Sequence, residues 1–316
     1  MRKRALVDVA LQVFGKPYQT ALCLLSLMRH CEPWIGTIFF IIESAKPKYD
    51  TVTVTALTDL VPKMRTVFMK NWLGVGSVDT ARLREAAYRR SVRYQYAWEK
   101  ASSDFLLVIH NDASFCGDVI APMLENMGDH IALGELGQCW NCPAARPHIV
   151  EALGVNSGSP CRREQYTDFS LTFQDLDAMY RLSRTRGEHI RNFLKAPWAD
   201  ELRKHPWPLP ECRVNEWCCM INMRLARGAT MPLGMARPFG AYASLTDLGV
   251  SWFRDVHRQG FRARHFDISP YVRHSMGHIH LWSKDAYHAR EESAAAALRA
   301  EFPEYAAELA ARGLPV

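Results

Sequence analysis

The chain has 316 residues, of which 48% are hydrophobic and 23% charged, and its formal net charge at pH 7 is +6. This balance is that of an ordinary globular protein with material for a large core. The positive charge is mild for the length and suits phosphate-bearing ligands, but it is smaller than the charge typical of a nucleic-acid-binding protein. The longest apolar runs, such as residues 37–42, have the length of a strand, so no integral membrane segment is predicted.

Two further features bear on the compartment. The start Met1-Arg2-Lys3-Arg4 is basic, but Asp8 and Gln12 interrupt the apolar stretch that follows, and no small-residue cleavage site is present. A secretory signal is therefore not expected. The nine cysteines are an odd number, which rules out complete internal disulfide pairing. We expect a cytoplasmic protein whose thiols serve metal binding or packing.

The first third of the chain alternates strand and helix patterns. Residues 7–13 place four aliphatic side chains on one face of a strand. Pro17 opens a helix with apolar residues at helical spacing, because proline is favoured in a first turn. Residues 37–42 are too apolar to face water and indicate a buried strand. This strand–helix–strand unit predicts a parallel sheet with a right-handed crossover.

A second series of elements leads to a polar cluster. Residues 51–56 and 66–69 are shorter strand candidates, and the pattern over residues 82–100 predicts one long helix. This helix is followed by residues 104–109, which form the clearest buried strand in the sequence. Ligands in open α/β sheets gather beyond the carboxyl ends of strands, so His110-Asn111-Asp112 follows at a position where a site is expected.

The pattern changes between about residues 137 and 214, which we interpret as a helical insertion that shapes an acceptor site. Helices are expected over residues 173–182, where Thr172 and Asp175 make a capping start, and over residues 188–195.

Beyond the insertion, the sheet is expected to resume at residues 215–223 and 264–268, and helix is expected from Asp285. We predict one α/β domain over residues 1–290 and a helical tail over residues 291–316.

Six segments in this order carry a resemblance to a known family. They are the strand and loop over residues 7–17, Ile41-Ile42-Glu43-Ser44, Arg93-Tyr94-Gln95, Ile109-His110-Asn111-Asp112, Thr246-Asp247, and Val272-Arg273-His274-Ser275-Met276-Gly277. Together they resemble family 2 glycosyltransferases and their GT-A relatives, over roughly residues 5–116 and 215–280. The Q-x-x-R-W signature of processive polysaccharide synthases is absent, which favours a transferase that makes single additions.

The resemblance implies a GT-A (Rossmann-like) α/β fold, with a mixed, mostly parallel sheet flanked by helices. It implies inverting transfer of a sugar from a nucleotide-diphosphate sugar to a glycan, a lipid-linked acceptor or another hydroxyl. Such a protein would work in the cytoplasm or at the inner face of the membrane. The residues implied in donor binding are Gln12, Phe14, Glu43, Arg93, Gln95 and Asn111.

The resemblance also implies a divalent cation at Asp112, which stands at the D-x-D position. A leaving diphosphate develops negative charge, which Mn²⁺ or Mg²⁺ stabilises as a Lewis acid. His274 is the candidate second ligand and favours Mn²⁺, with His278 in support. His110 replaces the first acid of the motif, and Asn111 and Asp112 also suit a turn, so metal binding and turn chemistry both stay open.

An acceptor hydroxyl needs a base to remove its proton. Asp247 matches the position of the family's base, and Glu216 is the reserve candidate. Thr246 and Asp247 would equally well cap a helix that starts near Leu248, so both interpretations stay open.

Four cysteines fall in or beside the insertion. Cys139 and Cys142 at C-x2-C spacing, followed by Cys161 and Cys212, would satisfy a tetrahedral structural Zn²⁺ site that holds the insertion together. Free, partly buried cysteines are an equal alternative, and a thioredoxin-like redox pair is a third.

Two other functions stay open. A retaining GT-A transferase or a nucleotidyltransferase would use similar donor chemistry. A non-catalytic, zinc-stapled binding module would recognise a partner without turnover.

Overall fold

The structure is a computed structural model that describes residues 7–50, 52–71, 73, 78–188, 193–194, 198–241, 247–275 and 283–316. At its centre is a seven-stranded sheet with the order β3-β2-β1-β4-β7-β6-β8. The strands are β1 (Val7–Val13), β2 (Ile35–Ile42), β3 (Met64–Phe68), β4 (Phe105–His110), β6 (Ala132–Leu136), β7 (Val214–Asn222) and β8 (Ala263–His265).

The sheet is mixed and mostly parallel. Strands β3, β2, β1 and β4 run parallel, whereas β7 is antiparallel to both β4 and β6, and β8 is parallel to β6. The predicted strand–helix–strand unit is confirmed, since helix α1 (Pro17–Cys31) connects β1 to β2. The predicted α/β class, with helices flanking such a sheet, is confirmed as well.

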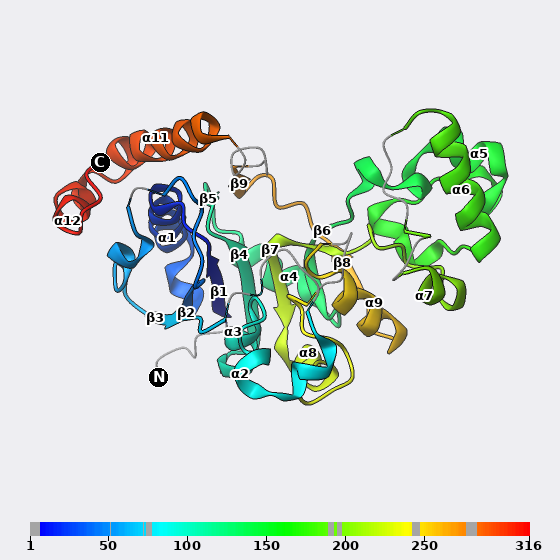
Figure 1. Cartoon of the computed structure of the whole chain (residues 1–316), viewed down its shortest axis with the longest axis horizontal. Helices are drawn as coiled ribbons and strands as arrows, with labels where there is room; N and C mark the ends of the chain where they lie inside the picture. Colours follow the sequence, from blue (N-terminus) through cyan, green and yellow to red (C-terminus); the bar gives the residue numbers. More distant parts are fainter. Residues whose placement is uncertain are drawn as a thin grey trace.

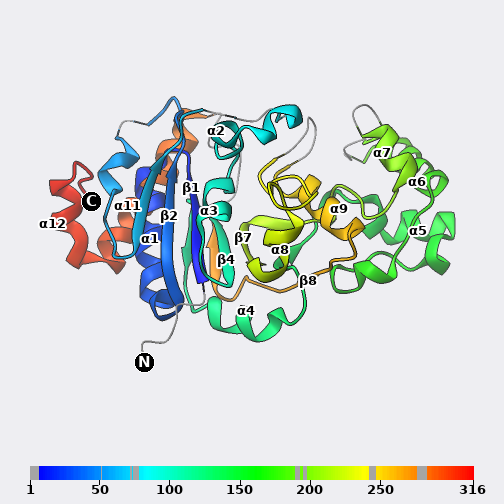
Figure 2. The ribbon, with the colours of Figure 1, turned by 90° about the horizontal axis from the view of Figure 1, so that it is seen from below.

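Helices cover both faces of the sheet (Figures 1 and 2). Alternate residues of β1 explain this, because Val9 and Leu11 pack with α1 and α4 (Ile120–Met127), whereas Ala10 packs on the other face. The helices on that other face are α3 (Gln95–Lys100), α8 (Met223–Ala229) and α9 (Val250–Arg258).

The segment between the end of β6 and the start of β7 forms a separate helical lobe, seen in green at one end of the molecule in Figure 1. It has a hydrophobic cluster of its own. Its helices are α5 (Pro147–Leu153), α6 (Phe173–Thr185) and α7 (Ala199–Lys204). The predicted start of α6 is confirmed, since Thr172 and Asp175 form a reciprocal capping box. The helix predicted over residues 188–195 lies mostly outside the described residues.

The C-terminal helices close over the first helix. Helix α11 (Lys284–Glu301) lies along α1 and is followed by α12 (Ala306–Ala311) (Figure 1). The Glu291 carboxylate accepts hydrogen bonds from the backbone nitrogens of Tyr18 and Gln19, at 2.9 and 3.4 Å. It therefore satisfies free donors in the first turn of α1, which has no acidic residue of its own. The predicted boundary between residues 290 and 291 falls within α11.

Two predicted elements are wrong. The strand predicted over residues 51–56 is not formed by the described residues 52–56, because a 3₁₀ helix occupies Val54–Leu57. The long helix over residues 82–100 is broken into a 3₁₀ helix (Thr80–Arg84), the short α2 (Ala86–Arg89) and α3. The break precedes α3 at Tyr94, whose φ of 65° is left-handed and incompatible with a continuous helix.

No helix in the described part of the chain is long and apolar enough to cross a membrane.

Candidate active site

The candidate site lies at the carboxyl ends of the parallel strands. Strand β4 ends at His110, and Asp112 follows it directly. Strand β7 runs antiparallel, with Cys218 opposite Ile109, so Glu216, close to its start, reaches the same edge. Parallel strands gather their carboxyl ends on one side of a sheet, which is where ligands bind in open α/β folds.

A small two-stranded sheet brings a distant segment to this edge. Strand β5 (Ala113–Phe115) pairs antiparallel with β9 (Val272–His274), and Ala113 lies opposite His274. The backbone nitrogen of Ser275 also donates to the carbonyl oxygen of Asp112, at 3.1 Å. The pairing fixes His274 beside Asp112 although 162 positions separate them, and the imidazole Nε2 lies 3.1 Å from Asp112 Oδ1.

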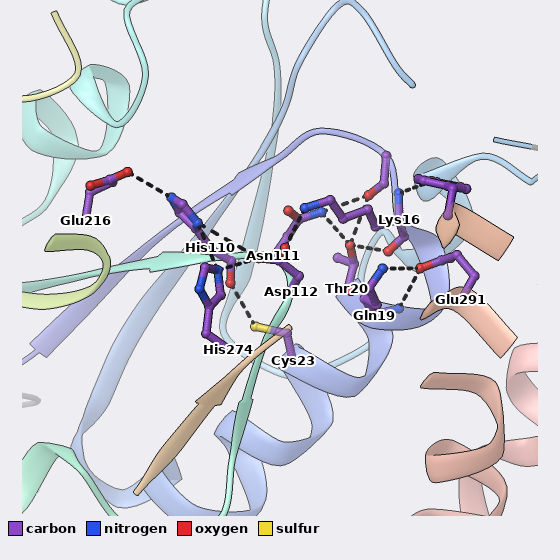
Figure 3. A network of polar contacts seen from close by, with 12 residues as sticks. Lys16, Gln19, Thr20, Cys23, His110, Asn111, Asp112, Glu216, His274 and Glu291 are labelled. Atoms are coloured by element: carbon purple, nitrogen blue, oxygen red, sulfur yellow. Dashed lines mark hydrogen bonds and ion pairs between the residues drawn. The ribbon is translucent and has the colours of Figure 1, made fainter. Parts of the chain in front are cut away.

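Three side chains form a compact group of potential metal ligands (Figure 3). One ligand atom from each of His110, Asp112 and His274 lies within 4.8 Å of the others. His110 Nδ1 is 3.3 Å from His274 Nε2. Among the described residues, neither His110 Nε2 nor His274 Nδ1 has a hydrogen-bond partner. The atoms that face one another are His110 Nδ1, His274 Nε2 and Asp112 Oδ1, and two imidazoles and a carboxylate at these distances fit a divalent cation.

The pKa shifts in this group favour the protonation states in which His110 and Asp112 can bind a metal ion. Burial, and next the neighbouring His274, lower the pKa of His110 to about 3, so its imidazole is neutral at physiological pH. Burial would raise the pKa of Asp112, but Lys16, His274 and His110 together hold it well below its usual range. The indole of Trp217 stacks on the His274 ring at 4.8 Å and 7°, which fixes its orientation.

Lys16 already places a cation on Asp112. Its Nζ lies 2.6 Å from Asp112 Oδ2, and the two side chains are 10% and 5% exposed. Lys16 reaches this position from the loop between β1 and α1, where its φ of 59° is left-handed. Tyr287 on α11 holds the loop, because its hydroxyl accepts from the Lys16 backbone nitrogen at 3.1 Å and also bonds Asp50.

Asn111 secures the same loop. Its amide nitrogen donates to the Gly15 carbonyl oxygen and to Thr20 Oγ1, both at 2.8 Å. In this arrangement its side chain holds the β1–α1 loop against β4, and the role in donor binding stays a prediction.

A second polar group lies at the ends of β1 and β2. Glu43 pairs with Arg93, whose Nε lies 2.8 Å from Oε1, and Gln12 donates to the same carboxylate at 3.4 Å. The Gln12 amide oxygen accepts from the backbone nitrogen of Tyr94 at 3.2 Å. These side chains line a cavity of about 10 Å³ together with Gly240.

Two residues predicted to bind the nucleotide-sugar donor, Gln95 and Phe14, do not belong to that group. Gln95 is buried, and its amide donates to Glu99 and to the Met231 carbonyl oxygen, at 3.1 and 3.0 Å. Phe14 is half-buried in the loop after β1. Their predicted roles in donor binding stay predictions.

Both predicted base candidates contact one buried arginine. Arg213 forms an ion pair with Glu216 and another with Asp247, whose Oδ2 is 2.8 Å from Nη2. Glu216 Oε1 is also 3.6 Å from His110 Nε2, so this group adjoins the metal-ligand group (Figure 3). Burial raises the pKa of Glu216 to about 7, with Asp247 adding to the rise and Arg213 opposing it. Asp247 also accepts from the backbone nitrogen of Leu248 at 2.9 Å, but it does not cap α9, whose N-cap is Gly249 and which has no side-chain cap hydrogen bond; Thr246, the other predicted cap, lies outside the described residues.

The four cysteines of the predicted zinc site line one cavity at the base of the insertion. His278, the further metal ligand predicted from the sequence, lies outside the described residues.

Three residues of the site were not predicted as functional. His110 was treated as a departure from a carboxylate motif, although its spacing of two from Asp112 along the chain was a usable signal for a ligand pair. Lys16 carries no local signal, because its partner Asp112 is 96 positions away. Arg213 has Glu216 three positions away, but its second partner, Asp247, is 34 positions away.

Comparisons with known proteins concern the fold. No protein-family model matches the sequence, and no curated protein matches it. Among solved structures, the chain is similar to S. aureus TarS 1–349, with 8% identity, a TM-score of 0.43, and coverage of 93% of this chain and 65% of that one. In the TarS complex with UDP the identity is 10%, the TM-score is 0.30, and the alignment covers 42% of this chain and only 35% of the TarS chain. The mannosyltransferase PcManGT from Pyrobaculum calidifontis, in complex with GDP-Man and Mn²⁺, is 12% identical with a TM-score of 0.45, covering 98% of this chain and 80% of that one.

Proposed function

We propose that this protein transfers a glycosyl group from a nucleoside-diphosphate sugar to a hydroxyl acceptor, with inversion and with a divalent cation. The observation that carries the proposal is the meeting of His110, Asp112 and His274 at the carboxyl edge of the parallel strands. A cation-binding group at that edge, flanked by candidate nucleoside and base residues, suits a substrate with a diphosphate leaving group.

The donor nucleoside would bind at the ends of β1 and β2. Glu43 accepts hydrogen bonds, and Arg93 is a cation next to the strand edge, so the pair suits a ribose and a phosphate. The cavity there, about 10 Å³, has room for a water molecule only. Binding of a nucleoside therefore requires Arg93, or the chain around Gly240, to move outward.

The diphosphate would lie over Asp112 with its ion. His110, Asp112 and His274 would hold the ion, and two imidazoles beside one carboxylate favour Mn²⁺ over Mg²⁺. When bound, the ion supplies positive charge that stabilises the departing diphosphate. Lys16 has a separate role, because its ammonium adjoins the same carboxylate and gives the phosphates a second cation.

Asp247 is the proposed base for the acceptor hydroxyl. Its side chain is 30% exposed and accessible to an acceptor, whereas the Glu216 side chain is 7% exposed. Glu216 lies between Arg213 and His110, so it positions these two groups and leaves proton removal to Asp247. The helical insertion begins and ends beside this group, and we assign it the binding of the acceptor, a glycan, a lipid-linked molecule or another hydroxyl compound.

The test is a thermal-shift screen of UDP- and GDP-sugars with and without Mn²⁺. A ligand at a hundredfold excess over its Kd should stabilise the protein by about 2.7 kcal/mol. Asp112→Asn should lose the Mn²⁺-dependent part of the shift, whereas Asp129→Asn, an exposed acid away from the site, should retain it. If Asp112→Asn keeps the full Mn²⁺-dependent shift, the metal assignment is wrong.

Product analysis separates the remaining alternatives. An inverted anomeric product supports the proposal, and a retained anomer indicates a retaining transferase. Formation of a nucleotide-sugar from a nucleoside triphosphate and a sugar phosphate, with release of pyrophosphate, indicates a nucleotidyltransferase. Tight binding of a nucleotide-sugar with neither transfer nor hydrolysis would show a binding module instead. Asp247→Asn should abolish turnover while preserving donor binding.

A further inference from the structure

The four cysteines at the base of the insertion come from three separate segments of the chain. Cys139 begins a 3₁₀ turn shortly after β6 and Cys142 follows that turn, Cys161 lies in the loop after α5, and Cys212 precedes β7. Together they line a cavity of about 20 Å³. A space of that size holds one water molecule or one ion and excludes an organic ligand.

Backbone hydrogen bonds fix these segments against one another. The nitrogens of Gly137 and Gln138 donate to the carbonyl oxygens of Arg213 and Glu211, at 2.7 and 2.9 Å, so the entering and leaving chains run side by side. The nitrogen of Cys161 donates to Ala144 at 2.8 Å, which secures the third segment beside the turn. The cysteines thus converge through the backbone of the fold.

The thiols also face one another. Cys212 contacts both Cys142 and Cys161, and the guanidinium of Arg163 contacts Cys139. All four side chains line the same cavity, so they could act as ligands of one ion.

We propose that Cys139, Cys142, Cys161 and Cys212 bind one structural Zn²⁺ ion. Four sulfur ligands, two of them at C-x2-C spacing, match the tetrahedral chemistry of closed structural zinc sites. Zinc–sulfur bonds of about 2.3 Å place the sulfurs roughly 3.8 Å apart. The cysteine sulfurs are less closely gathered than the ligand atoms of His110, Asp112 and His274, so binding draws them inward.

The ion would join the insertion to the sheet. Cys142 belongs to the hydrophobic cluster of the insertion, whereas Cys161 and Cys212 pack against both that cluster and the cluster on the sheet. Both chain connections to the insertion pass beside the four sulfurs. The site therefore fixes how the lobe sits on the sheet, and it does not depend on the proposed glycosyl transfer.

The test measures metal content. The full chain, purified under reducing conditions without chelators or added metal, is analysed by mass spectrometry for zinc per chain. We expect about one zinc ion in the wild type, and the loss of most of it in Cys161→Ser and Cys212→Ser. Cys116→Ser is the matched control, because Cys116 is exposed and outside the cluster. Asp112→Asn should keep its zinc, which separates this site from the proposed catalytic one.

Two further measurements keep the test decisive if a serine variant fails to fold. Co²⁺ exchanged into the wild type should show sulfur-to-cobalt charge-transfer absorption and the intense visible bands of tetrahedral coordination. Chelation should lower Tm and speed proteolysis between residues 137 and 213. The proposal would be overturned if metal-free wild-type protein shows neither of these two absorption features after Co²⁺ is added. Disulfide bonds between these cysteines would also overturn it.

Discussion

Replacing Lys16 with methionine is the sharpest test of the cation chemistry at the site. The substitution keeps most of the apolar stem and removes the ammonium 2.6 Å from Asp112 Oδ2. Since the two side chains are only 10% and 5% exposed, the carboxylate left behind is buried and loses its main cation. Breaking a buried pair in this way costs about 3–5 kcal/mol. We expect urea unfolding of Lys16→Met, without metal, to show a loss of that size.

The same variant should bind Mn²⁺ more tightly than the wild type. In the wild type an ion must share Asp112 with the ammonium, whereas in Lys16→Met both carboxylate oxygens are available. A relief of about 1.4 kcal/mol is a tenfold change in Kd, so titration calorimetry should resolve it. Mn²⁺ should also restore part of the lost stability.

Two comparisons make the result interpretable. Lys100→Met, at an exposed lysine on α3, should change neither stability nor Mn²⁺ binding. The double variant Lys16→Met/Asp112→Asn should lose about 1–3 kcal/mol less free energy of unfolding than the two single variants lose in sum. Each single change already breaks the ion pair, so the second change cannot break it again. Additive losses, with Mn²⁺ affinity unchanged, would refute the reasoning.

Three further predictions follow from the neighbouring groups. Arg93→Ala should weaken binding of UDP or GDP by about 1.5–3 kcal/mol, measured by calorimetry, while the exposed Arg84→Ala has no effect. Arg213→Met should lower the free energy of unfolding by about 3–5 kcal/mol, because Glu216 and Asp247 lose their shared cation; an unchanged urea midpoint would argue against this. Folded Glu216 has a pKa of about 7 against an ordinary 4.5, so between these values the folded chain holds a proton that the unfolded chain has released. Stability should therefore fall as pH rises through this window, by up to about 1.4 kcal/mol per pH unit, and Glu216→Gln should flatten the slope.

The first strands of the sheet could be predicted from their apolar patterns. Residues 37–42 are a continuous apolar run, and residues 7–13 carry aliphatic side chains at alternate positions. The region before α3 could not be read in this way. Its polar, arginine-rich pattern fits a helix, but tertiary contacts decide its path: Arg89 pairs with Glu99, Arg93 turns to Glu43, and Tyr94 takes a left-handed conformation.

The candidate site could likewise be predicted only in part. Asp112 was predicted from its place after the clearest strand, and His274 from the order of motifs in the resemblance; the structure brings these two together. His110 and Lys16 were not recognised as members of the group. His110 stands where the resemblance has an acid, so its spacing of two from Asp112 was treated as a departure from the motif. The ammonium of Lys16 reaches Asp112 only because the loop at Lys16 turns left-handed.

The contacts of α11 have a consequence for any shortened form of the protein. Tyr287 and Glu291 support the Lys16 loop and the first turn of α1, so this C-terminal helix stabilises the candidate site. A chain cut just ahead of residue 287 would lose both supports at once. Reduced turnover in such a chain would then be explained by displacement of the Lys16 ammonium and by fraying of the first turn of α1. It would not be evidence that the C-terminal tail binds the acceptor.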